Sequence, residues 1–536
     1  MHVEFILLIL SLLFFISIIA DKIGFKFGVP ALLLFLIVGM LFGPHGIGAI
    51  IGENGIEIKT GTAQALSTLA MCIILFSGGM DTKLSDIKSV IAPGITLATI
   101  GVLLTCAITG VIIYYLFGWI NAVASVSIWL ALLMAATMSS TDSASVFSIL
   151  RTNGIGLKHN LRPLLELESG ANDPMAYVLT TTLIGIVIKT HTIVGLVEDV
   201  EALPIIQTIV IQLVMGSVLG LAFGEGLVAL MRRIKLGNES LYPIMVLTAC
   251  IFIFSVTYYL QGNTYLAVYV GGLVIGNSKF TRKRQTKSFF NGLTWLSQLV
   301  MFLMLGLMVN PIELLHYKVW VPCLIISIVM IFISRPLSIW ICMLPFREYH
   351  QRDKIMLSWV GLKGAVPIIF AIMCKANGVP SADMIFNVVF LCTLVSLLVQ
   401  GTTLTMMAKK LNLTTPPEEQ RTLEHFDMDL PDEIQSSARE VEVTETMLAK
   451  GNTLREIQIP PRTLIIMVRR GEDFFIPTGS STLAVGDQLL VIRDKDAESA
   501  YKQMTDEAEE EIVWRAEVRQ KAHERWLRAT QWMRKK

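Results

Sequence analysis

The first 410 residues of the chain contain few charged side chains. They hold 45 Asp, Glu, Lys and Arg residues, about 11% of that segment, whereas the last 126 residues hold 42, about 33%. The chain as a whole is 53% hydrophobic, with a mean hydropathy of +0.62. This composition excludes an ordinary soluble fold for the first part. It predicts a membrane domain over 1–410, in contact with lipid, followed by a water-exposed tail.

Metal-binding and catalytic motifs are also missing. The seven cysteines fall in or at the ends of apolar segments, and none lies in a CxxC pair or a cluster with histidine. Buried small side chains are therefore expected, rather than disulfides or zinc ligands. The apolar segments contain no Gly-Xaa-Ser-Xaa-Gly or His-Glu-Xaa-Xaa-His sequence, which argues against an enzyme. The run at 3–20 lacks a basic start and a cleavage site, so we expect a membrane helix and not a signal peptide.

Long apolar runs dominate the first part of the chain. A helix needs about 20 mostly apolar residues to cross a bilayer. Thirteen segments qualify: 3–20, 30–50, 62–80, 89–117, 122–150, 160–188, 204–234, 240–260, 262–277, 290–308, 318–344, 354–376 and 384–410. We expect an all-α membrane domain of two six-helix inverted repeats joined by a linker helix, which makes the fifth and twelfth segments repeat mates.

The distribution of basic residues predicts the orientation. The loops after odd-numbered segments, together with the chain end, carry 20 Lys and Arg residues, against four in the other loops. Because basic loops stay in the cytoplasm, the N-terminus is expected outside and the tail inside.

The segment at 122–150 contains an unusual polar run, Met138–Ser145, in which six of eight side chains can form hydrogen bonds. Ser, Thr and Asp compete with the helical backbone for hydrogen bonds. Non-helical backbone in a membrane is tolerated only where it is buried in protein or lines a cavity. We predict an interrupted helix with Asp142 at a functional site. A hydroxyl-rich packing face between helices is the alternative.

The segment at 160–188 carries Ser169 three residues before Asn172 and four residues before Asp173, so Ser169 shares a helix face with each of them. Their oxygens suit a hard cation. One carboxylate with neutral oxygens predicts a weak, reversible site. The alternative is a helix that begins inside the membrane, with Asn172 or Asp173 as N-cap and Pro174 as its first residue.

The segment at 354–376 contains Gly361-Leu362-Lys363-Gly364-Ala365-Val366-Pro367. Two glycines and a proline weaken the helix around the lysine. Interrupted segments at matching positions of two repeats point to a transport site. Lys363 needs a counter-ion, and Glu168 is the predicted one; the alternative is that Lys363 reaches the cytoplasmic surface. Arg335, which precedes Pro336 in the segment at 318–344, is expected to be structural.

Thr141-Asp142, the run Glu168–Pro174 and the run Gly361–Pro367 resemble motifs of the monovalent cation–proton antiporters, the Na⁺/H⁺ and K⁺/H⁺ exchangers, over about residues 1–410. The similarity is greatest to the bacterial potassium/proton branch. It implies a homodimer in the bacterial inner membrane that works electroneutrally by an elevator-like movement. It also implies a role for each matching residue: Asp173 binds the cation and the proton, Asn172, Ser169, Asp142 and Thr141 complete the site, and Glu168 and Lys363 form a stabilising ion pair.

Two positions depart from the pattern of sodium-transporting relatives. Ser77 precedes Gly78-Gly79 where those relatives often have Glu, so Ser77 is only a further candidate ligand. Lys363 stands where Arg is usual. We expect K⁺ and H⁺ to compete for Asp173, since removal from water disfavours a charged carboxylate. The alternatives are Na⁺/H⁺ exchange by the same fold and, in another class, a ligand-gated cation channel, which needs no titrating carboxylate.

The tail divides into a linker at 411–433, a small α/β domain at 434–505 with short β runs, and a charged helix at 506–536. Gly451–Glu456, Arg469-Arg470-Gly471 and Gly486–Leu489 resemble the TrkA-C domains of K⁺ conductance regulators. That similarity implies dimerisation and a regulatory nucleotide or small ligand. It is the main reason to expect K⁺. A passive dimerisation module is the alternative, and no nucleic-acid partner is expected.

Overall fold

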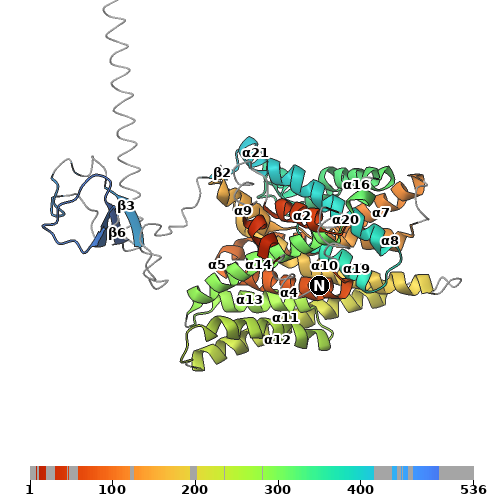
Figure 1. Cartoon of the computed structure of the whole chain (residues 1–536), viewed down its shortest axis with the longest axis horizontal. Coiled ribbons are helices and arrows are strands. Elements are labelled where there is room, and N and C mark those ends of the chain that lie inside the picture. Colours follow the sequence, from red (N-terminus) through yellow and green to blue (C-terminus); the bar gives the residue numbers. More distant parts are fainter. Residues whose placement is uncertain are drawn as a thin grey trace, which may run out of the picture. The chain divides into compact units, whose positions relative to one another are not determined.

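The structure is a computed structural model of the chain, and it forms two compact units, Met1–Pro417 and Glu418–Lys536, each described by itself (Figure 1). The helix predicted at 506–536 and most of the linker predicted at 411–433 lie outside the described residues. The described residues are 8, 11–19, 31–44, 46, 58–120, 126–192, 202–234, 236–280, 282–314, 316–415, 438–443, 448, 451–456, 463–471 and 473–493.

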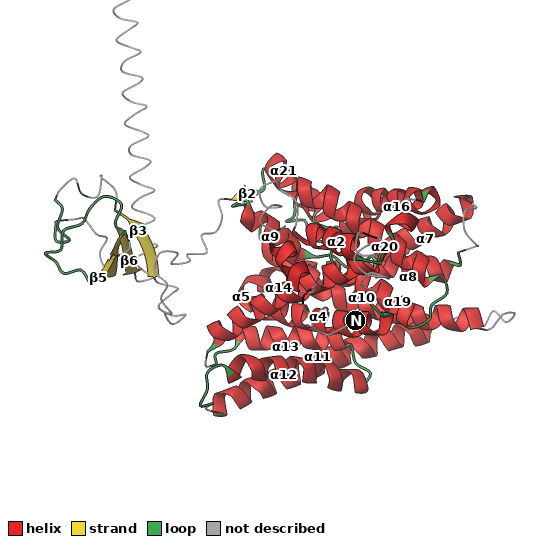
Figure 2. Cartoon of the chain, in the orientation of Figure 1, coloured by secondary structure: helices red, strands yellow, loops and turns green. Residues whose placement is uncertain are grey.

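The described part of the first unit is almost entirely helical (Figure 2). Residues 11–19 are helical. The other helices are α2 (Ala31–Phe42), α4 (Thr60–Asp81), α5 (Leu84–Ile87), α6 (Ile91–Thr96), α7 (Val102–Ile120), α8 (Ile128–Thr137), α9 (Ser143–Thr152), α10 (Leu161–Thr192), α11 (Ala202–Arg233), α12 (Leu241–Tyr259), α13 (Thr264–Asn277), α14 (Lys283–Met308), α15 (Pro311–Leu314), α16 (Tyr317–Val329), α17 (Arg335–Cys342), α18 (Gln351–Trp359), α19 (Val366–Ala376), α20 (Ala382–Ser396) and α21 (Thr402–Lys410).

Several short helices join into longer ones. A 3₁₀ turn, η1 (Lys88–Val90), and a π-helical turn, η2 (Leu97–Gly101), connect α5, α6 and α7. Two more π-helical turns, η3 (Met330–Ser334) and η4 (Leu397–Gly401), connect α16 to α17 and α20 to α21. Among the described residues, eight helices are long and apolar enough to cross a membrane, and four shorter apolar helices accompany them. A multi-pass membrane fold is therefore confirmed, while thirteen crossings in two repeats stay a prediction.

Both predicted interruptions are confirmed. Residues 138–142 are not helical and separate α8 from α9, and residues 360–365 separate α18 from α19. The alternative for the segment at 160–188 is wrong, because α10 continues through Pro174 and neither Asn172 nor Asp173 caps a helix. The Asn263 side chain donates a hydrogen bond to the Pro174 carbonyl, at 2.8 Å. This bond attaches α10, at the turn that contains the proline, to Asn263, the N-cap residue of α13.

Close glycine contacts bring two helices of the first unit together. α13 packs against α4 and α11, and Figure 1 draws α11, α12 and α13 side by side. A Cβ added at Gly272 of α13 would lie 2.3 Å from the Phe76 carbonyl of α4, and one at Gly276 would lie 2.2 Å from the Met80 carbonyl. Small residues four positions apart permit such close backbone approach in membranes. All seven cysteines are buried free thiols.

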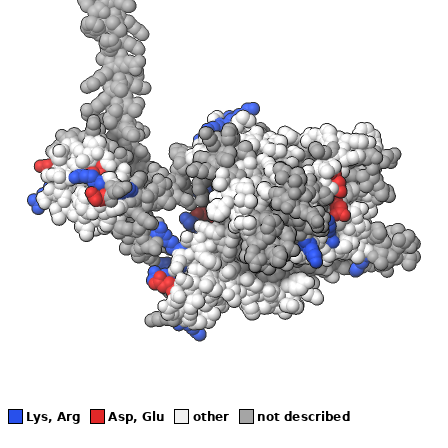
Figure 3. All heavy atoms as spheres, in the orientation of Figure 1, with Lys and Arg blue, Asp and Glu red and all other residues white. Residues whose placement is uncertain are grey.

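The outer surface of the first unit is largely uncharged. On the face in Figure 3, the charged atoms of its described part are few and gather near the rims. α11 carries an outward apolar row at four-residue spacing: Ile206, Val210, Val214 and Val218 are each more than half exposed. A helix surface of this kind is stable against lipid or another apolar surface, not against water.

A two-stranded sheet joins two distant segments of the first unit. β1 (Gly156–Leu157) lies in the connection between α9 and α10, and β2 (Thr414–Thr415) follows α21. The strands are antiparallel, with Gly156 opposite Thr415 and Leu157 opposite Thr414. The Lys158 N–H donates to the Leu413 carbonyl at 3.0 Å. The chain that leaves the membrane helices is thus attached to the loop between α9 and α10.

The second unit contains a four-stranded antiparallel sheet in the order β3 (Ala438–Glu442), β6 (Gln488–Arg493), β4 (Thr463–Arg470) and β5 (Asp473–Phe475). Val443, Val468 and Leu489 belong to its small core. The Arg470 guanidinium makes two hydrogen bonds to the buried Asp487 carboxylate, at 2.8 and 2.7 Å, and holds the pKa of that carboxyl below its usual range.

Candidate functional site

The two interrupted helices meet at their unwound stretches. The Asp142 N–H donates a hydrogen bond of 2.8 Å to the Leu362 carbonyl, so a backbone group freed by one interruption satisfies a group freed by the other. Gly364 lies against Asp142, and an added Cβ there would be 2.4 Å from Asp142 Oδ2. Glycine is required at 364 because the backbone of one stretch touches the carboxylate of the other.

Asp173 faces this crossing from α10. Its carboxylate is buried and accepts a hydrogen bond from the Ser140 hydroxyl, which belongs to the first unwound stretch. Burial of a carboxylate among helices requires a partner or a bound proton. A bound cation would satisfy the same requirement.

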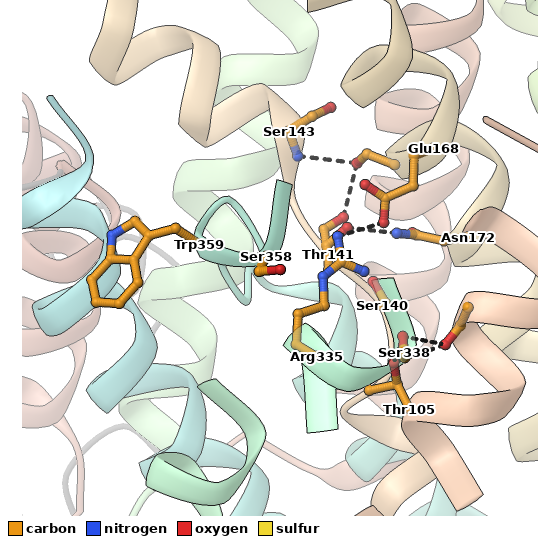
Figure 4. A network of polar contacts seen from close by, with 12 residues as sticks. Thr105, Ser140, Thr141, Ser143, Glu168, Asn172, Arg335, Ser338, Ser358 and Trp359 are labelled. Atoms are coloured by element: carbon orange, nitrogen blue, oxygen red, sulfur yellow. Dashed lines mark hydrogen bonds and ion pairs between the residues drawn. The ribbon is translucent and has the colours of Figure 1, made fainter. Parts of the chain in front are cut away.

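Ser169 connects α10 to both sides of the first interruption. Its hydroxyl donates to the Thr141 carbonyl at 2.8 Å and accepts from the Ser143 N–H at 3.0 Å. Figure 4 labels Thr141, in the first interruption, and Ser143, the first residue of α9, which these contacts join. The hydroxyl that was predicted as an ion ligand thus supports the unwound backbone in this structure.

Asn172 contributes an acceptor oxygen. Its amide nitrogen donates to the Thr141 hydroxyl at 2.5 Å, and Figure 4 shows the amide directed at Thr141. Its Oδ1 is buried and has no hydrogen-bond partner in the described part of the chain. A buried acceptor without a donor is costly in free energy. A cation beside Asp173 would remove that cost.

Asp142 caps a helix. Its carboxylate accepts from the Ser145 N–H at 3.1 Å and from the Ser145 hydroxyl at 2.5 Å. This is the geometry of an N-cap at the start of α9. At least part of the capacity of the Asp142 carboxylate to accept bonds is therefore used within its own chain segment.

The buried ion pair differs from the predicted one. Glu168 Oε1 accepts from Arg335 Nη2 at 2.7 Å, and both side chains are buried (Figure 4). Lys363 Nζ donates instead to the Ser140 carbonyl at 2.9 Å. The pairing of Glu168 with Lys363 is therefore corrected, because the Arg335 side chain from α17 occupies the position of the counter-ion. Lys363 is buried and does not reach the surface, so that alternative is also wrong.

Ser77 takes no part in these contacts. It is buried on α4, and no hydrogen bond joins it to Asp173 or Asn172 among the residues described. The site therefore consists of a carboxylate, an unsatisfied amide oxygen and hydroxyl oxygens from α10 and the first interruption, with one ammonium group nearby. Oxygens of this kind bind hard cations, and the carboxylate can also hold a proton.

The family comparison agrees with this arrangement. A model described as sodium/hydrogen exchanger, transmembrane, matches residues 6–410. The chain belongs to the sodium/hydrogen exchanger family. A model of the TrkA-C domain matches residues 438–505. Both resemblances inferred from sequence motifs are thus confirmed.

Relatives of this exchanger extend over nearly the whole chain. It is 35% identical to a protein named K(+)/H(+) antiporter NhaP2 from Shewanella sp. (strain MR-4), over 94% of this chain and 83% of that protein. It is also 35% identical to a K(+)/H(+) antiporter NhaP from Alkalimonas amylolytica, over 91% and 80%. The fold resembles that of the sodium proton antiporter MjNhaP1 from Methanocaldococcus jannaschii, with a TM-score of 0.61, 20% identity, and coverage of 75% and 100%.

Sequence reasoning missed two side chains of the exchanger site. Ser140 belongs to the predicted polar run without a role of its own, yet it contacts both Asp173 and Lys363. The sequence analysis predicts only a structural role for Arg335, although an arginine within a membrane helix requires a counter-ion. The free-energy cost of an unpaired arginine in a membrane helix was the signal that could have identified Arg335 as a partner for Glu168.

Proposed function

We propose that this protein exchanges K⁺ for H⁺ across the bacterial inner membrane, with one cation and one proton competing for Asp173. The observation that carries the proposal is a buried carboxylate, Asp173, next in sequence to Asn172, whose buried amide oxygen has no hydrogen-bond partner among the described residues. With a proton on Asp173, the site is neutral. With K⁺ bound, the ion neutralises the carboxylate and satisfies the amide oxygen. Since each state carries one added positive charge, exchange is electroneutral.

Each neighbouring group has a defined task in this mechanism. The Ser140 hydroxyl stabilises Asp173 as a carboxylate, and it can rotate to present its oxygen to a cation. Thr141 holds the Asn172 amide so that Oδ1 stays available.

Lys363 places a positive charge beside the first interruption, which weakens cation binding and keeps it reversible. Asp142 caps α9 and adds negative charge at the crossing. Ser169 fixes the unwound backbone, and Ser77 stays a more distant candidate.

The choice of K⁺ over Na⁺ rests on relatives and on the tail. The K⁺/H⁺ antiporters of Shewanella and Alkalimonas share both parts of the chain at 35% identity, whereas the Na(+)/H(+) antiporter NhaS2 of Synechocystis is 29% identical over 72% of this chain. Na⁺/H⁺ exchange is the second candidate. A ligand-gated channel is disfavoured because such a channel needs no buried carboxylate able to hold a proton, and Asp173 is buried at the crossing.

We propose the full architecture on the same basis. Thirteen membrane helices would form two inverted repeats, with the N-terminus outside, the tail in the cytoplasm and two copies in a dimer. Alternating access then exposes Asp173 first to one side and then to the other. Similar interruptions in α8–α9 and α18–α19 favour the repeat relation.

We also propose that the tail regulates exchange by binding a nucleotide or another small ligand. The attachment of β2 to β1 favours this role, because a force on the chain after α21 acts directly on the loop joining α9 to α10. Removal of residues 434–536 would test it. A change in the ligand or pH dependence of exchange is expected, and unaltered regulation would leave only a dimerisation role.

Proteoliposomes loaded with a pH-sensitive dye test the exchange itself. Adding K⁺ outside is expected to raise the internal pH by expelling protons, and Na⁺ is expected to give a smaller signal. Asp173→Asn should abolish the signal, with Asp383→Asn on the exposed start of α20 as the matched control. Unchanged proton movement in Asp173→Asn would exclude Asp173 as the shared site. Potassium flux without proton movement would indicate a channel.

A further inference from the structure

The second unwound stretch leaves buried backbone groups without helical partners. Trp359 ends α18, so no following turn of that helix can donate to its carbonyl. The Lys363 N–H lies in the non-helical stretch before α19. Backbone groups within packed helices require other partners when the helical ones are missing.

Two side chains supply these partners, one at the end of α20 and one in the following π-helical turn η4. The Lys363 N–H donates to Ser396 Oγ at 2.9 Å, and the Ser396 hydroxyl donates to Gln400 Oε1 at 2.5 Å. The Gln400 amide then donates to the Trp359 carbonyl at 2.9 Å. Three hydrogen bonds therefore run in one direction from Lys363 to Trp359. We call Ser396 and Gln400 the brace.

The brace is isolated from solvent. Ser396 is 2% exposed and Gln400 1% exposed. They line a small cavity that Lys363 and Arg335 also line. Gln400 belongs to the π-helical turn η4, and such turns often occur at functional sites. In a low-dielectric surrounding, linked hydrogen bonds strengthen one another, and the loss of one member affects the rest.

Lys363 connects the brace to the ion site. Its N–H is held by the brace, and its ammonium donates to the Ser140 carbonyl. The Ser140 hydroxyl in turn donates to Asp173. Lysine has four rotatable bonds, and its position depends on where its backbone is held. A displaced Lys363 backbone would move the ammonium away from Ser140, and the environment of Asp173 would change.

We propose that Ser396 and Gln400 are positioning residues for ion exchange, holding the Lys363 backbone so that its ammonium stays on Ser140 and sets the balance between cation and proton at Asp173. This inference depends on the proposed function of Asp173. The brace acts through Lys363 and touches neither the ion nor the proton.

Matched alanine variants separate this role from packing. Ser396→Ala removes the acceptor for the Lys363 N–H, whereas Ser327→Ala removes a buried hydroxyl that lines the same cavity and donates to the Cys323 carbonyl of its own helix. In proteoliposomes, Ser396→Ala and Gln400→Leu are expected to change the apparent KM for K⁺ about three- to tenfold. They should also shift the pH dependence of exchange. Ser327→Ala should stay within about twofold. Ser396→Thr, which keeps the hydroxyl, should restore the parent values.

A second measurement tests whether the effect passes through Lys363. The K⁺-induced rise in melting temperature of the full-length detergent-solubilised protein reports binding without turnover. In a Lys363→Gln background, Ser396→Ala should leave the K⁺ and pH dependence of this rise unchanged, although it still lowers the melting temperature itself. A further change in K⁺ binding in that background would overturn the proposal. So would a Ser396→Ala variant that alters only stability.

Asp173→Asn distinguishes failure of this inference from failure of the proposed function. Loss of K⁺ binding in Asp173→Asn together with parent-like Ser396→Ala would reject the brace alone. Retained competition between K⁺ and protons in Asp173→Asn would reject the site assignment on which both depend.

Discussion

Both interrupted helices contain a short unwound stretch supported by side chains from neighbouring helices, but the two stretches carry side chains of opposite charge. The stretch at 138–142 carries hydroxyls and a carboxylate, and its backbone is supported by Ser169 of α10. The stretch at 360–365 carries two glycines and a lysine, and its backbone is supported by Ser396 and Gln400. Asp142 caps α9, whereas α19 begins without a side-chain cap. One stretch thus provides oxygens and negative charge, while the other provides positive charge and space for close approach.

The two stretches should therefore respond differently to substitutions. Hydroxyl and carboxylate groups of the first stretch should tolerate replacements that preserve hydrogen bonding. The second stretch should be sensitive to added volume and to loss of charge. The ion pair between Glu168 and Arg335 lies beside both stretches and should affect folding more than either.

The largest effect is expected when the buried ion pair is broken. Glu168→Gln leaves Arg335 charged and unpaired, which should lower stability by about 3 kcal/mol or more. The melting temperature of the solubilised protein measures this loss. Replacing both partners, as Glu168→Gln with Arg335→Met, should recover much of it. If the single variant were as stable as the parent, the pair would be unimportant to the crossing.

Added volume at the second stretch should be next in effect. Gly364→Ala places a methyl group 2.4 Å from Asp142 Oδ2, so the two stretches must separate. Exchange in proteoliposomes should fall more than about tenfold, since overpacking of this kind costs 1–3 kcal/mol. Gly185→Ala is the control, because an added Cβ there has nothing within 4 Å. Equal activity of both variants would show that the close contact is unnecessary.

Loss of charge at the second stretch should change the affinity of the site for K⁺ in competition with protons. Lys363→Met removes the ammonium beside Ser140, and the site should then hold cations more tightly and release them more slowly. We expect a lower apparent KM for K⁺ and a lower maximal rate, each by several-fold, as about 1 kcal/mol of electrostatic change would give. Lys363→Arg should retain most of the parent behaviour. A higher KM in Lys363→Met would contradict the assigned role.

The smallest effect is expected at the cap of the first stretch. Asn is about as good an N-cap as Asp, so Asp142→Asn should keep the melting temperature nearly unchanged. Asp142→Ala should lower stability by about 1 kcal/mol. Any loss of exchange in Asp142→Asn then reports the charge of Asp142 alone. If Asp142→Asn were less stable than Asp142→Ala, the carboxylate would have a role other than capping.

The sequence predicted the local features of the fold well. Hydropathy located the membrane helices, and glycine, proline and hydroxyl-rich runs located both interruptions. These features depend on neighbouring residues in the chain. The structure around Pro174 was harder to predict, because the residues there fit both a helix start and a helix interior. The Asn263 side chain, which is distant in sequence, supports the Pro174 carbonyl in the continuous helix.

From the chain alone, helical periodicity predicts that Ser169 shares a face with Asn172 and with Asp173, because residues three and four apart lie on one side of a helix. Hydropathy likewise indicates that two cations, Arg335 and Lys363, lie among apolar helices. The packing of the helices in space selects Arg335 as the partner of Glu168 and places Ser396 and Gln400 against the second stretch. Those contacts depend on which helices are neighbours and how far each side chain reaches. No spacing along the chain records either property.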